Sequence, residues 1–212
     1  MIFPRLYPIL DYSCFAAKAD PVGAMLRFAE ELLTAGATIV QYRDKSSVAG
    51  HFLSNARELR RLTLNRARLI INDRVDLALA CDADGVHLGQ GDLSPAAARK
   101  IFDEIKDGRT RIVGFSTHNL TQLREAGSMP IDYIAVGPVF ATASKANPDP
   151  VVGVDGVRHA REATAKPLVA IGGITRLNAQ QVREAGADSV AVIADLLNAP
   201  AKAVEDFLRV LG

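Results

Sequence analysis

Short apolar runs alternate with amphipathic stretches along all 212 residues of the chain. Most of the runs are continuous stretches of Val, Ile, Leu and Ala, which is typical of parallel strands covered on both faces. They predict eight strands, at Leu6–Asp11, Ile39–Asp44, Leu69–Arg74, Gly85–Gln90, Arg111–His118, Tyr133–Phe140, Leu168–Ile174 and Ser189–Leu196.

Helical signals lie between these runs. Asp20 followed by Pro21 is typical of a helix start, and Met25, Phe28 and Leu32 then repeat at helical spacing. A glycine ends several of the amphipathic stretches and leads directly into the next apolar run, as in REAGADSVAVI. The other predicted helix starts follow Ser47, Ser94 and Thr175.

Eight strands that alternate with helices predict an α/β fold, a compact (β/α)8 TIM barrel. An open doubly wound sheet is the alternative, but counting eight units rather than five or six favours the barrel. Because no linker or low-complexity segment divides the chain, we expect residues 1–212 to form one domain.

Charge and composition narrow the class of partner. Lys and Arg number 25 against 24 Asp and Glu, so the basic excess of a nucleic-acid-binding protein is missing. In an apolar region the longest charge-free stretch runs from about Tyr133 to Ser144, too short to span a bilayer. The first residues resemble no secretory signal, and Cys14 and Cys81 make no disulfide framework. We expect a cytoplasmic protein without nucleic-acid or membrane partners; a homodimer stays an open alternative to the monomer.

The carboxyl ends of the strands are where a barrel carries its active site. Gln41, Arg43 and Lys45 occupy alternate positions and therefore face one side. An arginine fork beside a lysine suits pyrophosphate or another polyanion. A solvated loop with a surface ion pair explains the same residues equally well.

Asn72, Asp73 and Asp92 follow two strands that would be neighbours in the barrel. Two carboxylates and an amide are plausible oxygen ligands for Mg²⁺, which binds through one or two carboxylates plus substrate phosphates. Structural roles compete with this interpretation, because Asp73 could cap the helix through VDLALA and Asp92 could stabilise the turn before Ser94. Each aspartate taken alone favours the structural role.

The last two strands indicate a phosphate site. Gly172 and Gly173 precede a predicted helix, and small residues let a phosphate approach backbone N–H groups there. Ile193 and Ala194 would supply the partner loop. A tight turn that needs glycine is the alternative, but the pairing of the two loops favours phosphate.

Histidines give weaker signals. His118 could carry a proton, yet a histidine beside a helix start is more often structural. His87 lies in the middle of a predicted strand and is interpreted as a packed, hydrogen-bonded core residue. No nucleophile-elbow sequence and no zinc-type pair of histidines is present in the sequence. The combined pattern predicts a site for two anionic substrates, one of them a diphosphate accompanied by Mg²⁺.

The motifs QYRDK, LIINDRVDLAL, DGVHLGQGDLSP, VGFSTHN, GPVFATASK and VAIGGIT together resemble the thiamine phosphate synthase family, from about Leu6 to Leu196. The resemblance implies a (β/α)8 barrel and a transferase of thiamine biosynthesis. Such an enzyme joins 4-amino-5-hydroxymethyl-2-methylpyrimidine diphosphate to 4-methyl-5-(2-phosphooxyethyl)thiazole, requires Mg²⁺ and releases pyrophosphate by a dissociative carbocation mechanism.

Residue roles follow from the resemblance alone. The pyrimidine diphosphate would be held by Gln41, Tyr42, Arg43, Asp44, Lys45, Asn72, Ser116 and Lys145. The thiazole phosphate would be held by Thr142, Ala143, Ser144, Gly173, Ile193 and Ala194, where Ala194 replaces the family's usual hydroxyl residue. Mg²⁺ would be bound by Asp73 and Asp92, and catalysis would depend on Arg43, Lys45, Ser116 and Lys145.

Two other functions stay open on the sequence. A thiazole tautomerase of the same family would use a histidine such as His118. A non-catalytic regulator that binds thiazole or thiamine phosphate would have lost the metal carboxylates. Because QYRDK, Asn72, Asp73 and the GQGD segment are all present, we expect the synthase.

Overall fold

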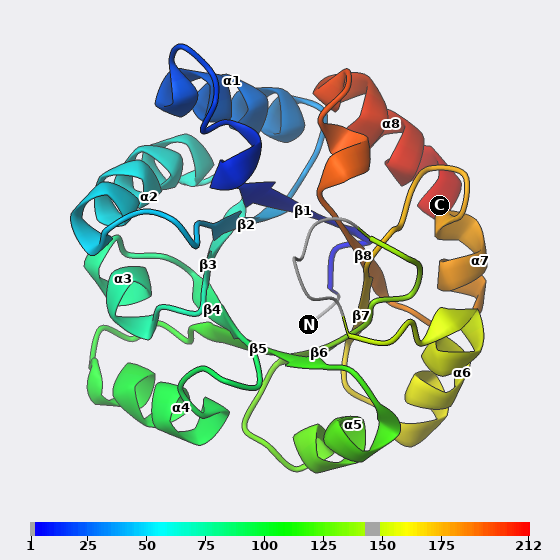
Figure 1. Ribbon diagram of the computed structural model, residues 1–212. Coiled ribbons are helices and arrows are strands. Elements are labelled where there is room, and N and C mark those ends of the chain that lie inside the picture. Colours follow the sequence, from blue (N-terminus) through cyan, green and yellow to red (C-terminus); the bar gives the residue numbers. More distant parts are fainter. Residues whose placement is uncertain (1–2, 143–148) are drawn as a thin grey trace.

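The structure, a computed structural model, describes residues 3–142 and 149–212. Its eight strands are all parallel and close on themselves in sequence order, β1 pairing with both β2 and β8. The helices form an outer ring around this barrel (Figure 1). The predicted TIM barrel is therefore confirmed, and the alternative of an open sheet is wrong.

The elements follow one another with short connections. The strands are β1 Leu6–Asp11, β2 Ile39–Arg43, β3 Arg68–Asn72, β4 Gly85–Leu88, β5 Ile112–Thr117, β6 Tyr133–Val136, β7 Leu168–Ile171 and β8 Ser189–Val192. The helices are α1 Pro21–Thr34, α2 Ala49–Thr63, α3 Val75–Ala80, α4 Pro95–Glu104, α5 Leu120–Gly127, α6 Gly153–Ala163, α7 Ala179–Glu184 and α8 Pro200–Leu211. Two short 3-10 helices, η1 Tyr12–Cys14 and η2 Ala194–Leu196, follow β1 and β8.

Two separate apolar cores result from the alternation of side chains along each strand. The larger core fills the space between the barrel and the helices. The smaller core fills the barrel itself, where Phe3, Tyr7 and Tyr133 pack their rings together near the base. The site above therefore rests on a closed floor.

Several strands end earlier than the sequence predicts. The predicted strand Tyr133–Phe140 ends at Val136, and the predicted strand Ser189–Leu196 ends at Val192. The apolar character continues beyond the last pairing because residues after the strands still pack beneath the helices: Val139, Ile174 and Leu196 are buried. Polar residues that follow a strand consequently lie on the rim of the barrel.

A repeated contact ties the amino-terminal ends of the barrel together. An aspartate lies directly before each of β4, β6 and β8. Its carboxylate accepts one hydrogen bond from a backbone N–H of the preceding strand and one from an arginine in the helix that leads into that preceding strand. The three sets are Asp84 with Leu69 and Arg60 (2.8 and 2.8 Å), Asp132 with Val113 and Arg99 (2.7 and 2.7 Å), and Asp188 with Leu168 and Arg161 (2.8 and 2.8 Å).

No helix within the described residues has both the length and the apolar character needed to cross a bilayer.

Candidate active site

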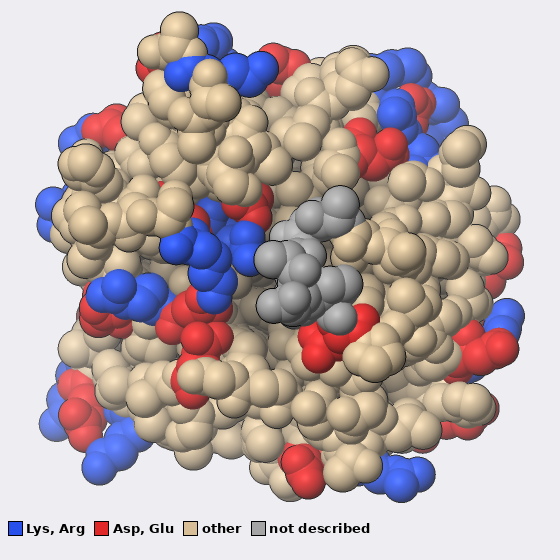
Figure 2. Space-filling view, in the orientation of Figure 1, with Lys and Arg blue, Asp and Glu red and all other residues tan. Residues whose placement is uncertain are grey.

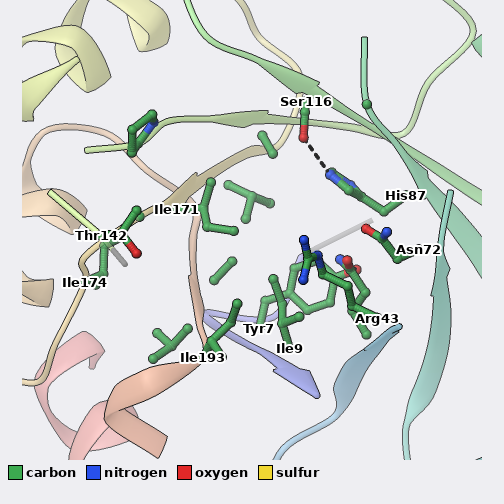
Figure 3. A pocket seen from close by; sticks show the side chains of 18 of the residues that line it. Tyr7, Ile9, Arg43, Asn72, His87, Ser116, Thr142, Ile171, Ile174 and Ile193 are labelled. Atoms are coloured by element: carbon green, nitrogen blue, oxygen red, sulfur yellow. Dashed lines mark hydrogen bonds between the residues drawn. The ribbon is translucent and has the colours of Figure 1, made fainter. Parts of the chain in front are cut away.

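A cavity of about 640 Å³ opens at the carboxyl ends of the strands. Its two sides differ in chemistry (Figure 3): Arg43, Asn72 and Ser116 lie on one side, whereas Ile171 and Ile193 lie on the other. The ends of β2 to β5 supply the polar side, and those of β7 and β8 supply most of the apolar side. Such a cavity can hold a polar, charged group and an apolar ring at once.

The end of β2 divides its residues between two faces. Gln41, Arg43 and Lys45 line the cavity, as their alternate spacing predicts. Tyr42 and Asp44 do not line it, and their contact with substrate stays a prediction. The same alternation directs their side chains toward the helices.

Asp44 instead shapes the loop that carries Lys45. Its carboxylate accepts bonds from the Ser46 and Ser47 backbone N–H groups at 2.9 and 3.0 Å. The Tyr42 hydroxyl donates to the other oxygen at 3.2 Å and also accepts from Asn55. Asp44 and Tyr42 therefore brace the loop from behind.

Both cations of the β2 end have acidic partners. Arg43 forms an ion pair with Asp11 at the end of β1, and Lys45 forms one with Asp73. Figure 2 shows basic and acidic side chains gathered together beside the central hollow. A surface ion pair, the alternative considered for this loop, thus exists for Lys45, but the same side chain faces the cavity.

Asp73 and Asp92 converge on the rim, and neither fits the role of a helix cap. The α3 helix begins without a side-chain cap, and Ser94 caps α4 through its bond from the Ala97 N–H at 3.3 Å. Asp92 does stabilise a turn, because it accepts the Gly89 N–H at 2.7 Å. Burial and the neighbouring Asp92 carboxyl raise the pKa of Asp73, although Lys45 works against them.

A carboxyl pair of this kind fits a divalent cation. Asp73 adopts a φ of 63°, a left-handed conformation uncommon for a residue other than glycine. Within the described residues no group of three or more His, Cys, Asp or Glu side chains is arranged so that it could hold a metal ion. Two carboxylates would therefore hold Mg²⁺ only with water and a ligand phosphate completing its shell, which is the usual pattern for this ion.

The loops after β7 and β8 expose backbone donors to the cavity. Gly172 and Gly173 have φ values of 99° and 62°, and a Cβ on Gly173 would lie 2.5 Å from the Ala141 carbonyl oxygen. In the described structure the N–H groups of Gly173 and Ala194 donate to no protein acceptor. Free N–H groups on facing loops are suited to a phosphate.

The two loops are also fixed to each other. Asp195, the second residue of η2, accepts the Arg176 backbone N–H at 2.9 Å and its Nε at 3.0 Å. Asn178 donates to the Gly173 carbonyl at 3.0 Å. The exposed N–H groups are therefore held in place before any ligand arrives.

The floor contains residues that the sequence-based prediction missed. Tyr7, His87 and Tyr133 line the cavity beneath Ser116. His87 was interpreted as a packed, hydrogen-bonded residue; it is hydrogen-bonded, but it packs inside the barrel, where the cavity reaches it. Their position on inward-facing, alternate strand residues was the signal that could have identified them.

His118 lies apart from the cavity lining. Its Nδ1 is 2.7 Å from the Gly137 carbonyl oxygen and 3.4 Å from an Asp149 carboxylate oxygen. It therefore links two loops, as the structural interpretation predicts. Thr142 lines the cavity, whereas Ala143, Ser144 and Lys145 lie outside the described residues.

Comparisons with a family model and with known protein sequences all identify the same family. A family model described as thiamine monophosphate synthase matches residues 7–196. A thiamine-phosphate synthase of Koribacter versatilis is 51% identical over 208 residues, covering 98% of this chain and 96% of the relative. One from Vibrio campbellii is 37% identical over 206 residues, covering 96% of each chain.

Solved structures agree with these sequences. Thiamine phosphate pyrophosphorylase from Pyrococcus furiosus superposes with a TM-score of 0.83 at 32% identity, covering 98% of this chain and 95% of that one. A geranylgeranylglyceryl phosphate synthase from Thermoplasma acidophilum gives 0.70 at 14% identity, covering 98% and 92%. The second likeness shows the barrel fold alone.

Proposed function

The chain belongs to the thiamine monophosphate synthase family and is a transferase that makes thiamine phosphate, and on that premise we propose how its cavity divides the work. The polar side takes the pyrimidine diphosphate, and the loops after β7 and β8 take the thiazole phosphate. The observation that carries this assignment is the presence of two different anion-binding arrangements in one cavity.

Cationic side chains serve the diphosphate. Arg43 and Lys45 extend from one face of the β2 end, and both already contact carboxylates, with which a more strongly charged anionic ligand would compete for the two cations. Asn72 and Gln41 lie beside them in the lining and offer amide groups to the pyrimidine. Lys145, outside the described residues, stays a prediction for the same ligand.

Asp73 and Asp92 would hold Mg²⁺ between the protein and the diphosphate. Burial, and after it the neighbouring Asp92 carboxyl, raises the pKa of Asp73, and a bound cation would offset both effects. When bound, Mg²⁺ neutralises charge on the pyrophosphate that leaves. Two protein carboxylates are enough for this ion, because ligand phosphates and water supply the other oxygens.

Backbone donors serve the thiazole phosphate. The N–H groups of Gly173 and Ala194 need only main-chain geometry, so alanine at position 194 keeps a donor even without a hydroxyl side chain. Thr142 adds a hydroxyl from the β6 loop. Ala143, Ser144 and Ile193 remain predictions for the same phosphate site.

The reaction needs positioned charge more than proton transfer. The bond between the pyrimidine methylene and the diphosphate oxygen breaks with both electrons leaving on pyrophosphate. The thiazole nitrogen then forms the new carbon–nitrogen bond. Arg43 and Lys45 stabilise the charge that grows on the leaving group. The apolar side, with Ile171 and Ile193, keeps water from capturing the cation first.

Separate ligand titrations test the division. We expect Arg43→Gln, which retains a donor for Asp11, to weaken pyrophosphate binding in Mg²⁺ about tenfold and to leave thiazole phosphate binding unchanged. Thr142→Ala should show the opposite pattern. Arg74→Ala is the control, because Arg74 is paired with Asp76 outside the cavity lining. Equal weakening of both ligands by either variant would refute the division.

A further inference from the structure

A chain of hydrogen bonds crosses the floor of the cavity. The Gln41 amide nitrogen donates to the Tyr7 hydroxyl at 3.0 Å, and the Tyr7 and Tyr133 hydroxyls lie 3.0 Å apart. His87 Nδ1 is 2.8 Å from the Tyr133 hydroxyl, and His87 Nε2 is 2.8 Å from Ser116 Oγ. Figure 3 shows the last of these bonds.

The chain is buried and tightly packed. Tyr7, Tyr133 and His87 are 1%, 0% and 9% exposed. The His87 ring stacks on that of Tyr133 with centroids 5.5 Å apart. Gly114 makes room for the tyrosine, because a Cβ there would lie 2.0 Å from Tyr133 Cζ.

Burial also keeps the tyrosines protonated. Desolvation raises the pKa of Tyr7 and of Tyr133 well above the usual value for a phenol. Each hydroxyl therefore always carries one hydrogen to donate and can accept at least one other. A buried hydroxyl hydrogen without an acceptor would be costly, so the bonds must run in a consistent direction.

Gln41 fixes that direction, since an amide nitrogen can only donate. Tyr7 accepts from it and donates to Tyr133, which in turn donates to His87 Nδ1. His87 is then the neutral tautomer with hydrogen on Nε2, and it donates to Ser116. If Tyr133 instead donated to Tyr7, the Tyr7 hydroxyl oxygen would accept from both Gln41 and Tyr133, and the Tyr7 hydroxyl hydrogen would have no acceptor.

We propose that Tyr7, Tyr133 and His87 are positioning residues that couple the hydrogen-bonding polarity of Ser116 to the orientation of the Gln41 amide, so that both residues face the pyrimidine with a defined polarity. Gln41 keeps its carbonyl oxygen for a ligand N–H, and Ser116 keeps its hydroxyl hydrogen for a ligand acceptor. Neither of these atoms has another partner in the described structure. An aminopyrimidine offers both an N–H and ring nitrogens. The inference rests on the proposed placement of the pyrimidine at these two residues.

Tyr133→Phe tests the chain because it removes one oxygen and keeps the ring. We expect kcat/KM for the pyrimidine diphosphate to fall about ten- to a hundredfold, while KM for the thiazole phosphate stays unchanged. Tyr12→Phe makes the same chemical change in η1, outside the cavity lining, and should leave both constants unchanged. Wild-type pyrimidine kinetics in a folded Tyr133→Phe enzyme would overturn the proposal.

The tautomer of His87 can be measured directly, and it would not change if Tyr133 contributed to packing alone. The chain has four histidines, so ¹⁵N-histidine spectra are assignable with one His87→Gln sample. We expect the proton on Nε2 in the wild type and a mixture of tautomers in Tyr133→Phe. A proton on Nδ1 in the wild type would overturn the proposal. Failure of the wild type to form product would instead refute the proposed function, and the spectrum would still decide the hydrogen-bond chain.

Discussion

At the scale of single residues, Asp73 has both an unusual backbone conformation and a carboxyl group close to another carboxyl group. Its φ of 63° is left-handed, and its carboxyl group lies against that of Asp92. Asp and Asn accept this conformation more readily than most residues. Asn can therefore replace Asp73 without backbone strain, so this substitution separates the proposed role in metal binding from any role in folding.

We predict that Asp73→Asn lowers Mg²⁺-supported kcat/KM by about two orders of magnitude, because an amide replaces a charged ligand. The midpoint temperature of its thermal unfolding should stay close to that of the wild type. Calorimetric titration with Mg²⁺ and pyrophosphate checks the loss of metal affinity. Asp76→Asn, a solvent-facing change three residues away, is the control. A variant that unfolds, or one that keeps full Mg²⁺ affinity, would contradict the metal role.

The pKa of Asp44 leads us to predict that the stability of the fold depends on pH. Burial opposes ionisation of its carboxyl, but hydrogen bonds from Ser47 and Ser46 outweigh burial and hold its pKa below the usual value. The pKa is thus lower in the folded than in the unfolded chain. Ionised Asp44 stabilises the fold fully above a pH of about 4, and this contribution is lost as the pH falls through the folded value.

We predict that Asp44→Asn makes the free energy of unfolding depend less steeply on pH in the acidic range. Urea unfolding between neutral and acidic pH would measure the free energy of unfolding for both proteins. Their difference should shrink as the pH falls through the titration of Asp44. A difference that is constant over this range would show that the carboxylate has no such role.

At the scale of elements, the repeated aspartate contact explains how neighbouring units are held in register. Asp132 joins the N–H of Val113 in β5 to Arg99 in α4. Because Val113 is fully buried, removing its acceptor leaves an unsatisfied N–H in the protein interior.

We expect Asp132→Ala to lower the free energy of unfolding by about 1–3 kcal/mol. Chemical denaturation measures the change. Asp155→Ala is the matched control, since the Asp155 side chain is 81% exposed and, among the residues that the structure describes, pairs with Arg158 of its own helix alone. The control should change the free energy by less than about 0.5 kcal/mol. Equal effects of the two substitutions would argue against a structural role for the repeat.

The elements themselves could be predicted from the sequence, because continuous apolar runs and helix starts are local signals. The ends of strands could not, since Val139 and Leu196 are buried without belonging to a strand. The alternation along β2 correctly placed Gln41, Arg43 and Lys45 in the cavity. The hydrogen-bond chain was missed because it joins β1, β2, β4, β5 and β6, which only the closed barrel brings together.

At the scale of the whole molecule, closure of the barrel brings together two proposed anion sites that are far apart in the sequence. The β2 end and the β8 loop are separated by about 150 residues, yet both line one cavity. β1 lies between them and carries Asp11, which holds Arg43 in place. We therefore propose that one cavity binds both phosphorylated heterocycles and joins them with help from Mg²⁺.

The most direct test is to follow thiamine phosphate formation from both substrates, with Mg²⁺ or with EDTA, in the wild type and in Asp73→Asn. We predict product with Mg²⁺, none with EDTA, and about a hundredfold less with the variant. Product formed at the same rate after chelation, or at the wild-type rate by Asp73→Asn, would contradict the account.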